Sequence, residues 1–534
     1  MSEPKQGVQM RKELPLVRAR RSIFKVVKYP VLGAAFICYL DVLPEIAAAQ
    51  HFGITDRTQT REWAPGAIEH AQQMRKYQDS DHGSQPTPKI ICRFCTYEDP
   101  SGQIATFQPG GTTFTANNAF FQPPLGSTNQ RTCFTCHQPQ NGWSISASDA
   151  HDRFEDSRGT DPLFRLFDGA TCPTDDDSTI GAKRKAYKLL ISKGLIRVGL
   201  KLELAQNLQF EVAHVDDPYN CTTNPSTGLT SPASGIVSIY RRPLPSTNLR
   251  FLTTIMWDGR EATLEDQAND ATQIHGQTTT ALTPDQRAQI VIFENGIFTS
   301  QILDEEACNL DGCGGTGGPV AVARQSLNFF VGINDPVGKN PTKAPFDANI
   351  FNLYKPWLSL QGNDEESRQR RSVARGEEVF NTTKITITGV AGLNDDLQLP
   401  KIAGFCGTCH DTPNVGNHSV KAPLNIGVAD AGANSPPALD ISGLPVFTLH
   451  CTMGPLAGKM FVVTDPGRAL ITGNCADIGK VKGPILRGLA ARAPYFHNGS
   501  AATLLDVVNF YDQRFGIGFT RQQRDDLVNF LSTL

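Results

Sequence analysis

The stretch CFTCH at residues 133–137 and the stretch CGTCH at residues 406–410 repeat one pattern, C-x-x-C-H, at two distant places in the chain. This pattern is the signature of covalent c-type haem attachment. Two thiols one helical turn apart add to the two vinyl groups of haem, and the adjacent histidine reaches the iron from the same side. A zinc site or a redox dithiol is the alternative, but two chance matches in one chain are improbable. The predicted haem-binding residues are Cys133, Cys136, His137, Cys406, Cys409 and His410.

The length and composition of the chain are those of a globular protein with more than one domain. Its 534 residues exceed what one hydrophobic core usually organises. It has 39% hydrophobic and 19% charged residues, and 50 basic against 53 acidic residues give a net charge of −3. The chain lacks the excess of basic residues that is typical of nucleic-acid binders, so no nucleic-acid partner is expected. It also lacks the high net charge of a disordered chain.

The N-terminal region has the layout of a secretory signal peptide. Basic residues precede the apolar run Val31–Leu40, and Ala47–Ala49 provide a small-residue cleavage site. The run is shorter than the ~20 residues that cross a bilayer, so no stable membrane insertion is expected. We predict a signal peptide over residues 1–49 and a periplasmic mature protein. The alternatives are an uncleaved anchor and, from the arginine pair at residues 20–21, a twin-arginine signal, which haem attachment to an unfolded chain disfavours.

Thirteen cysteines need an assignment. Cleavage of the signal peptide removes Cys38, and two haems take four, which leaves eight for disulfides in an oxidising compartment. Cys92 and Cys95 also have C-x-x-C spacing, but Thr96 stands where the histidine would be, so a local disulfide is favoured over a third haem. The mature protein is then expected to contain no free thiol. Nearness in sequence, which selects one of many pairings, suggests the other bridges: Cys172 with Cys221, Cys308 with Cys313, and Cys451 with Cys475.

A change of pattern near residue 365 predicts a domain boundary. Two stretches rich in glycine and proline lie before it, between residues 311 and 345. A helical pattern follows it, and near the C-terminus Thr503 and Thr520 each stand three residues before a capping-box partner. The predicted domains are an N-terminal haem domain over residues 50–364 and a C-terminal haem domain over residues 365–534.

Three further blocks of sequence carry a resemblance. MWDGR at residues 256–260 is followed by LEDQA at residues 264–268, and APYFHNGS stands at residues 493–500. With the two C-x-x-C-H motifs in this order, the blocks resemble the bacterial di-haem cytochrome c peroxidase and MauG family. The resemblance runs from about residue 130 to the end, apart from a family-atypical insertion at about residues 138–240. It implies a mainly α-helical fold of two cytochrome c-like haem domains with long irregular loops and insertions.

The resemblance assigns roles to side chains around the first haem. The family's W-D-G-R tryptophan relays electrons between the haems, which implies this role for Trp257, with a core tryptophan as the alternative. Gln267 matches a distal glutamine of the family, but Gln277 occupies the place of its catalytic glutamate and cannot move a proton between peroxide oxygens. The imidazole of His275 can do so, unless it is a surface histidine. His151 is a candidate sixth ligand of a resting state.

Tyr511 matches the position that supplies the sixth ligand of the C-terminal haem in the family. Peroxidases of the family carry methionine there, whereas MauG carries tyrosine. A phenolate lowers the potential of the iron and a thioether raises it. A core tyrosine with a paired hydroxyl is the alternative. His497, within APYFHNGS, is implied to lie near the haems, or else is a buried structural histidine. If the alignment is shifted, the rival ligands are His418, His450, Met453 and Met460.

Together these features predict a periplasmic di-haem c-type oxidoreductase. Hydrogen peroxide would react at the N-terminal haem. The C-terminal haem would exchange electrons with a small donor protein, a cytochrome c or a cupredoxin, or with a client protein as in MauG. The resemblance also implies calcium between the domains, bound partly by backbone carbonyls near Pro494. The alternatives are an electron-transfer di-haem cytochrome without peroxidase activity and a dioxygen-using enzyme of the rubber-oxygenase kind.

Overall fold

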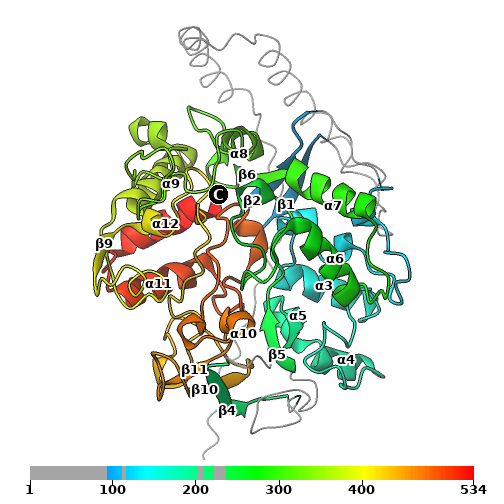
Figure 1. Ribbon diagram of the computed structural model, residues 1–534. Coiled ribbons are helices and arrows are strands. Elements are labelled where there is room, and N and C mark those ends of the chain that lie inside the picture. The colour runs from blue at the N-terminus through cyan, green and yellow to red at the C-terminus, as the bar shows by residue number, and fades with distance from the viewer. Residues whose placement is uncertain (1–92, 111–115, 202–207, 220, 222–235) are drawn as a thin grey trace, which may run out of the picture. The chain divides into compact units, whose positions relative to one another are not determined.

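The computed structural model of the protein describes residues 93–110, 116–201, 208–219, 221 and 236–534. All of them belong to the second of two compact units, residues 57–534 (Figure 1). The predicted signal peptide, with Cys38, lies outside the described residues, and so does Cys92. Within the described ranges, no helix is both long and apolar enough to span a bilayer.

Ten α-helices form in the described part of the chain. Several begin where the sequence places a capping side chain: Thr503 and Thr520 form the predicted capping boxes with Asp506 and Gln523. The helices are α3 (Ala147–Ser157), α4 (Ile180–Ala186), α5 (Lys188–Lys193), α6 (Leu264–His275), α7 (Pro284–Gly296), α8 (Pro319–Gln325), α9 (Glu365–Thr382), α10 (Ala469–Thr472), α11 (Leu504–Phe515) and α12 (Arg521–Ser532).

Strands form a substantial second part of the structure beside the helices. The four sheets have the orders β1-β2-β6-β7, β11-β10-β4, β3-β5 and β8-β9, and all their pairings are antiparallel. The strands are β1 (Phe94–Asp99), β2 (Gly102–Phe107), β3 (Ile196–Lys201), β4 (Phe210–Asp216), β5 (Ile236–Arg241), β6 (Phe298–Asp304), β7 (Cys308–Asn309), β8 (Ile385–Ile387), β9 (Ile402–Gly404), β10 (Val446–Cys451) and β11 (Met460–Val463).

The prediction of a mainly α-helical fold is therefore wrong in its proportions, because the fold is mixed. The missed strands lie mostly in the insertion and in the loops, where short alternating patterns are easily overlooked. In β10, for example, buried and half-buried residues alternate along Val446–Cys451, as expected for a strand with one face on a core.

One sheet joins parts of the chain from both sides of residue 365. Strand β4, from the insertion, pairs with β10, with Phe210 opposite Cys451 and Asp216 opposite Val446 (Figure 1). A disulfide between Cys451 and Cys475 ties the end of β10 to the following loop. The insertion is thus built into a sheet with the C-terminal half, and the domain boundaries remain a prediction.

The helix α9 predicted after residue 365 packs along α12 (Figure 1). The two helices approach most closely at Gly376, where a Cβ would collide with the backbone carbonyl of Asp526. Val373 and Phe380 of α9 are buried in one hydrophobic core. The same core packs against Cys406, so it supports the second C-x-x-C-H motif.

The disulfide pattern agrees with the prediction in two pairs and differs in one. Cys172 bonds to Cys221 and Cys451 to Cys475, as expected. Cys308 is instead a free, exposed thiol, while Cys313 belongs to a disulfide. Cys308 lies on the outer strand β7, whereas Cys313 packs against the core, so the two side chains occupy different environments. The expectation of no free thiol is therefore wrong.

Alkylation of the intact protein with iodoacetamide should label Cys308 and leave Cys313 unlabelled in peptide mass spectra. The reaction should be slow, because burial and then the nearby Glu366 raise the pKa of the Cys308 thiol. A sample alkylated after unfolding without reductant provides the control. Recovery of a peptide that links Cys308 to Cys313 would contradict the structure.

Candidate functional site

The two C-x-x-C-H motifs have the same local geometry. Each begins as a single 3₁₀ turn, Cys133–Thr135 in one and Cys406–Thr408 in the other. In both turns, the threonine side chain accepts a hydrogen bond from the backbone N–H three residues earlier, at 3.0 Å for Thr135 and 2.9 Å for Thr408. This bond fixes the start of the turn. The threonine shared by the two motifs therefore presents both cysteines of each pair in one arrangement.

The histidine of each motif is held in the tautomer that binds a metal. The Nδ1 atom of His137 lies 2.9 Å from the Trp143 carbonyl oxygen, and that of His410 lies 2.6 Å from the Gly416 carbonyl oxygen. A carbonyl can only accept, so Nδ1 carries the proton and Nε2 keeps its lone pair. Burial lowers the pKa of His137 to about 4 and also lowers that of His410. Both imidazoles are therefore neutral, with an Nε2 lone pair that could bind a metal.

The four thiols of the motifs are free of disulfides. Burial raises the pKa of each, to about 12 for Cys406 and Cys409. Each pair borders a large cavity. The first cavity, beside Cys133 and Cys136, has an empty volume of about 1600 Å³, and the second, beside Cys406 and Cys409, about 1670 Å³, both partly open to solvent. Each cavity is lined by both cysteines and the histidine of one motif, which is the arrangement that covalent haem attachment requires.

Buried cations line these cavities without a carboxylate partner in the described part of the chain. Arg242 and Lys482 line both cavities, and Arg492 lines the second. Their hydrogen bonds go to backbone carbonyls, with Lys482 Nζ 3.2 Å from the Thr254 oxygen. Burial, then repulsion from Arg492, lowers the pKa of Lys482 to about 7 and of Arg242 to about 9. Buried cations need anions, and haem brings two propionates, so the residues fit this group.

One layer of residues separates the two cavities, and we call it the shared wall. Trp257 is part of it: its Nε1 donates to the Arg242 carbonyl at 2.8 Å, and its own carbonyl accepts from the backbone N–H of Lys482 at 2.8 Å. The centre of its ring lies 6.0 Å from that of His497. The structure thus brings Trp257 to both haem sites. The shared wall consists of Arg242, Pro243, Leu244, Pro245, Trp257 and Lys482.

A buried ionic network holds the shared wall in place. Arg241 donates to Asp258, the aspartate of W-D-G-R, and to Asp465 at 2.7 Å. Arg260 also donates to Asp258, at 3.0 Å. The Nε2 atom of His497 lies 3.5 Å from the Asp465 carboxylate, and burial lowers the pKa of His497 to about 4. Arg241 therefore joins the W-D-G-R block to Asp465, which lies beside the histidine of APYFHNGS.

Helix α6 presents its predicted functional residues to the first cavity. Gln267 and His275 are eight positions apart, which places them on one face of a helix. Both line the first cavity, as does Trp257. Gln277, at the position of the family's glutamate, comes after the helix end and accepts from Asn129 at 3.3 Å. The residues of α6 along the cavity are Leu264, Gln267, Ala268, Ala271, Thr272 and His275.

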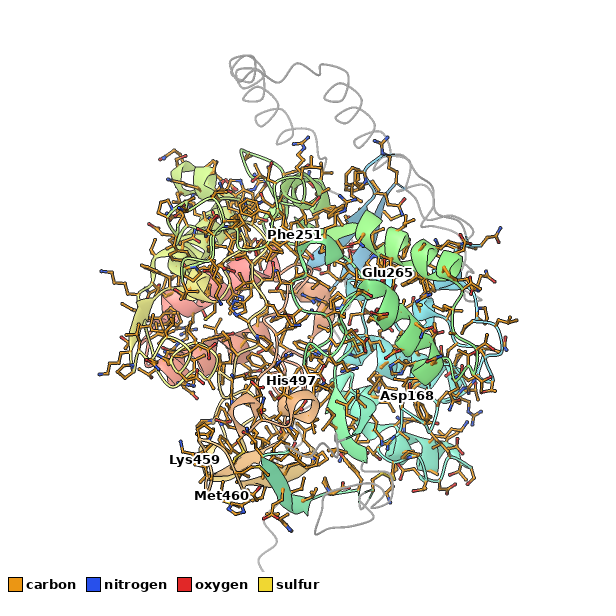
Figure 2. All side chains as sticks on the ribbon, viewed as in Figure 1. Asp168, Phe251, Glu265, Lys459, Met460 and His497 are labelled. Atoms are coloured by element: carbon orange, nitrogen blue, oxygen red, sulfur yellow. A yellow bond between two sulfur atoms is a disulfide. The ribbon has the colours of Figure 1, made fainter. Side chains whose placement is uncertain are left out.

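Two acidic side chains at the first cavity were not expected from the sequence. Asp168, which comes from the insertion and is labelled in Figure 2, accepts a hydrogen bond from His275 Nδ1 at 2.8 Å. Glu294, on α7, is buried, and burial raises its pKa to about 7. Asp168 is distant from His275 in sequence, and no motif marked either acid. His151, by contrast, has a side chain that is 52% exposed on α3 and does not line this cavity.

Tyr511 and His418 both line the second cavity. Burial raises the pKa of Tyr511 and lowers that of His418 to about 3. The ring centres of Tyr511 and His410 are 6.5 Å apart. The other rival ligands lie elsewhere: Met460 and His450 stand on the sheet that contains β10, with His450 bound to Glu211 at 3.0 Å and Met460 52% exposed.

No group of three or more histidine, cysteine, aspartate or glutamate side chains in the described ranges is arranged to hold a metal ion. The calcium ion that the resemblance implies remains a prediction. The peptide bond between Ala493 and Pro494, near the carbonyls expected to bind it, is cis.

Comparison with known proteins confirms the resemblance predicted from the motifs. Residues 117–290 match the family model described as di-haem cytochrome c peroxidase. Cytochrome-c peroxidase IdrP2 of Denitromonas iodatirespirans is 33% identical over 139 residues, which are 24% of this chain and 36% of the relative. Cytochrome c551 peroxidase of Nitrosomonas europaea is 31% identical over 130 residues, 24% of this chain and 30% of the relative.

The matched segments thus span only about a third of these relatives. A solved structure of a MauG-like protein associated with microbial copper homeostasis is 15% identical, covers 78% of this chain and 86% of its own, and has a TM-score of 0.32.

Replacement of Arg241 by methionine should lower the free energy of unfolding by about 3–5 kcal/mol, because it leaves the buried Asp465 carboxylate without its cation and leaves Asp258 with Arg260 alone. Urea titration of the haem-loaded protein, followed by circular dichroism, measures the change. Arg521→Met is the control, since this arginine is 95% exposed and its loss should change stability by at most about 0.5 kcal/mol. Equal effects of the two substitutions would refute the role of the network.

Proposed function

We propose that this protein, which resembles the di-haem cytochrome c peroxidases over its N-terminal haem region, is a periplasmic di-haem c-type oxidoreductase of the cytochrome c peroxidase and MauG type. Its proposed domains are an N-terminal haem domain over residues 50–364 and a C-terminal one over residues 365–534. The observation that carries the proposal is the shared wall, in which Trp257 borders two cavities that each contain a haem-attachment motif.

The first cavity is the proposed peroxide site. When bound there, haem c supplies an iron at which hydrogen peroxide is reduced. The chain must supply a group that takes a proton from the near peroxide oxygen and returns it to the departing oxygen. His275 is that group, and the Gln267 amide, on the same helix face, donates a hydrogen bond to the peroxide. Both side chains line this cavity, which supports the assignment.

The second cavity is the proposed electron-transfer site. Its lining is largely apolar, and Tyr511 faces it from α11. A phenolate ligand would close the site to substrates and lower its potential. Electrons then pass between the cavities by way of Trp257, whose N–H stays bound to the Arg242 carbonyl. Their source is a small periplasmic donor protein, a cytochrome c or a cupredoxin, or a residue of a client protein.

EPR and optical titration of the purified protein with peroxide, with and without prior one-electron reduction, tests the proposal. We expect one high-spin and one low-spin haem, with the high-spin signal lost on addition of peroxide. Two low-spin haems that ignore peroxide would identify an electron-transfer cytochrome instead. A reaction with dioxygen but not with peroxide would favour the rubber-oxygenase kind of enzyme.

Replacement of Tyr511 by phenylalanine should change the EPR and optical spectra of the low-spin haem and raise its reduction potential, because an anionic oxygen ligand is lost. The substitution removes one hydroxyl from a side chain at the cavity, so the fold should persist. His418→Ala is the paired variant, since His418 lines the same cavity. An unchanged spectrum in Tyr511→Phe, with a changed one in His418→Ala, would assign the ligand to His418.

A further inference from the structure

The insertion at about residues 138–240 contributes a charged residue to the first cavity. We propose that Asp168 is a positioning residue that fixes His275 as a proton acceptor facing the cavity, and that Arg131 locks this pair to the first C-x-x-C-H motif. The inference rests on the proposed function, because it concerns the base of the same reaction. Through Asp168, the insertion would take part in positioning the base of the reaction.

The geometry of the pair is that of a carboxylate that orients an imidazole. The Asp168 Oδ2 atom lies 2.8 Å from His275 Nδ1. Asp168 is 3% exposed, whereas the His275 side chain is 29% exposed and lines the cavity. The buried acid thus contacts the histidine from within the wall of the same cavity.

Asp168 is held as an anion. Burial raises its pKa, but the charge of Arg131 and the bond from His275 outweigh this, so the net shift is downward. An ionised carboxylate only accepts hydrogen bonds, so His275 Nδ1 carries a proton, and in the neutral imidazole Nε2 keeps the free lone pair. The same logic fixes the tautomer of histidine bases in hydrolases.

Arg131 connects this pair to the haem site. One of its terminal nitrogens, Nη1, lies 2.7 and 2.6 Å from the two oxygens of Asp168. Its other N–H groups donate to the carbonyls of Pro162 and Leu163, both at 2.7 Å. Arg131 stands two positions before Cys133. The insertion loop is therefore clamped to the segment that attaches the first haem, which sets the distance of His275 from it.

Several other ionisable groups interact electrostatically with the pair. Cys136, Tyr187 and Arg197 interact with Asp168, and the pKa of Tyr187 is raised to about 12, chiefly by burial. His137, which lines the same cavity, lies within electrostatic range of His275. In the described part of the chain, His275 Nδ1 has its hydrogen bond with Asp168 and with none of these groups.

The proposed proton transfer conserves the protons and electrons of peroxide reduction. Reduction of H₂O₂ to two water molecules consumes two electrons and two protons. His275 Nε2 takes the proton of the near oxygen and delivers it to the far oxygen, which leaves as water when the O–O bond breaks. The imidazole ends as it began. The electrons come from the redox donor protein, and the two net protons come from solvent.

Cyanide binding to the oxidised holoprotein tests the pair without turnover. Hydrogen cyanide is protonated at neutral pH and must lose its proton as it binds iron, so a base in the cavity speeds its association. In the double variant Arg131→Gln/Asp168→Asn, which removes both charges and leaves no buried ion unpaired, stopped-flow association should slow by about 100-fold. His275→Ala should slow it equally, and the triple variant no further. Carbon monoxide, which carries no proton, should bind the reduced variants at the unchanged rate.

Asp526→Asn is the matched control. Asp526 is also buried and also binds an arginine, Arg375 at 2.8 Å, but it lines neither cavity. The Asp526→Asn variant should be less stable than the wild-type protein and should bind cyanide at the wild-type rate. The conservative variant Asp168→Glu should recover part of the cyanide association rate that the double variant loses. This recovery separates an effect on the position of His275 from an effect on folding. If the double variant does not fold, Asp168→Glu is tested in its place.

Two results would overturn the proposal. One is a cyanide rate that does not change in the double variant or in His275→Ala. The other is a low-spin signal of the resting protein that becomes high-spin in His275→Ala, since His275 would then be an iron ligand. If the cyanide rate depends on Asp168 while peroxide leaves both haems unchanged, the pair stands and the proposed peroxidase function fails.

Discussion

The guanidinium of Arg241 holds together two segments of the chain that meet at the shared wall. It binds Asp258, next to Trp257 in sequence, and Asp465, which lies beside His497. All of these charges are buried, and a buried ion left alone costs several kcal/mol. Each partner therefore fixes the position of the others. The tryptophan keeps its place between the two cavities only while both segments stay docked around this cation.

Around this fixed centre, the two haem sites are alike on one side and different on the other. His137 and His410 are each held by the carbonyl six residues later, so the two motif histidines are presented in the same way. Elsewhere in the lining, one cavity has an imidazole bonded to Asp168, and the other has the phenol of Tyr511 in apolar surroundings. The chemical difference between the two cavities therefore lies in the side chains other than the motif histidines.

The parts of the site that could be predicted from sequence are those set by local spacing. Five consecutive residues define each haem motif, and the eight-residue interval from Gln267 to His275 puts both on one helix face. Asp168 could not be found this way, since it meets His275 only through a tertiary contact across 107 positions. The same limit explains the missed pairing of β4 with β10 and the wrong partner for Cys308, because nearness in sequence does not determine strand or disulfide partners.

The buried cations around the cavities link cofactor binding to folding. Arg242 and Lys482 face both cavities, and within the described ranges only backbone carbonyls accept their hydrogen bonds. Carbonyl dipoles solvate a buried charge less well than an anion does. A ligand that brings anionic groups to these side chains removes that cost and stabilises the folded state in proportion to its binding. The shared wall is therefore suited to a protein with anionic ligands in both cavities, where the same residues would hold these ligands and separate them.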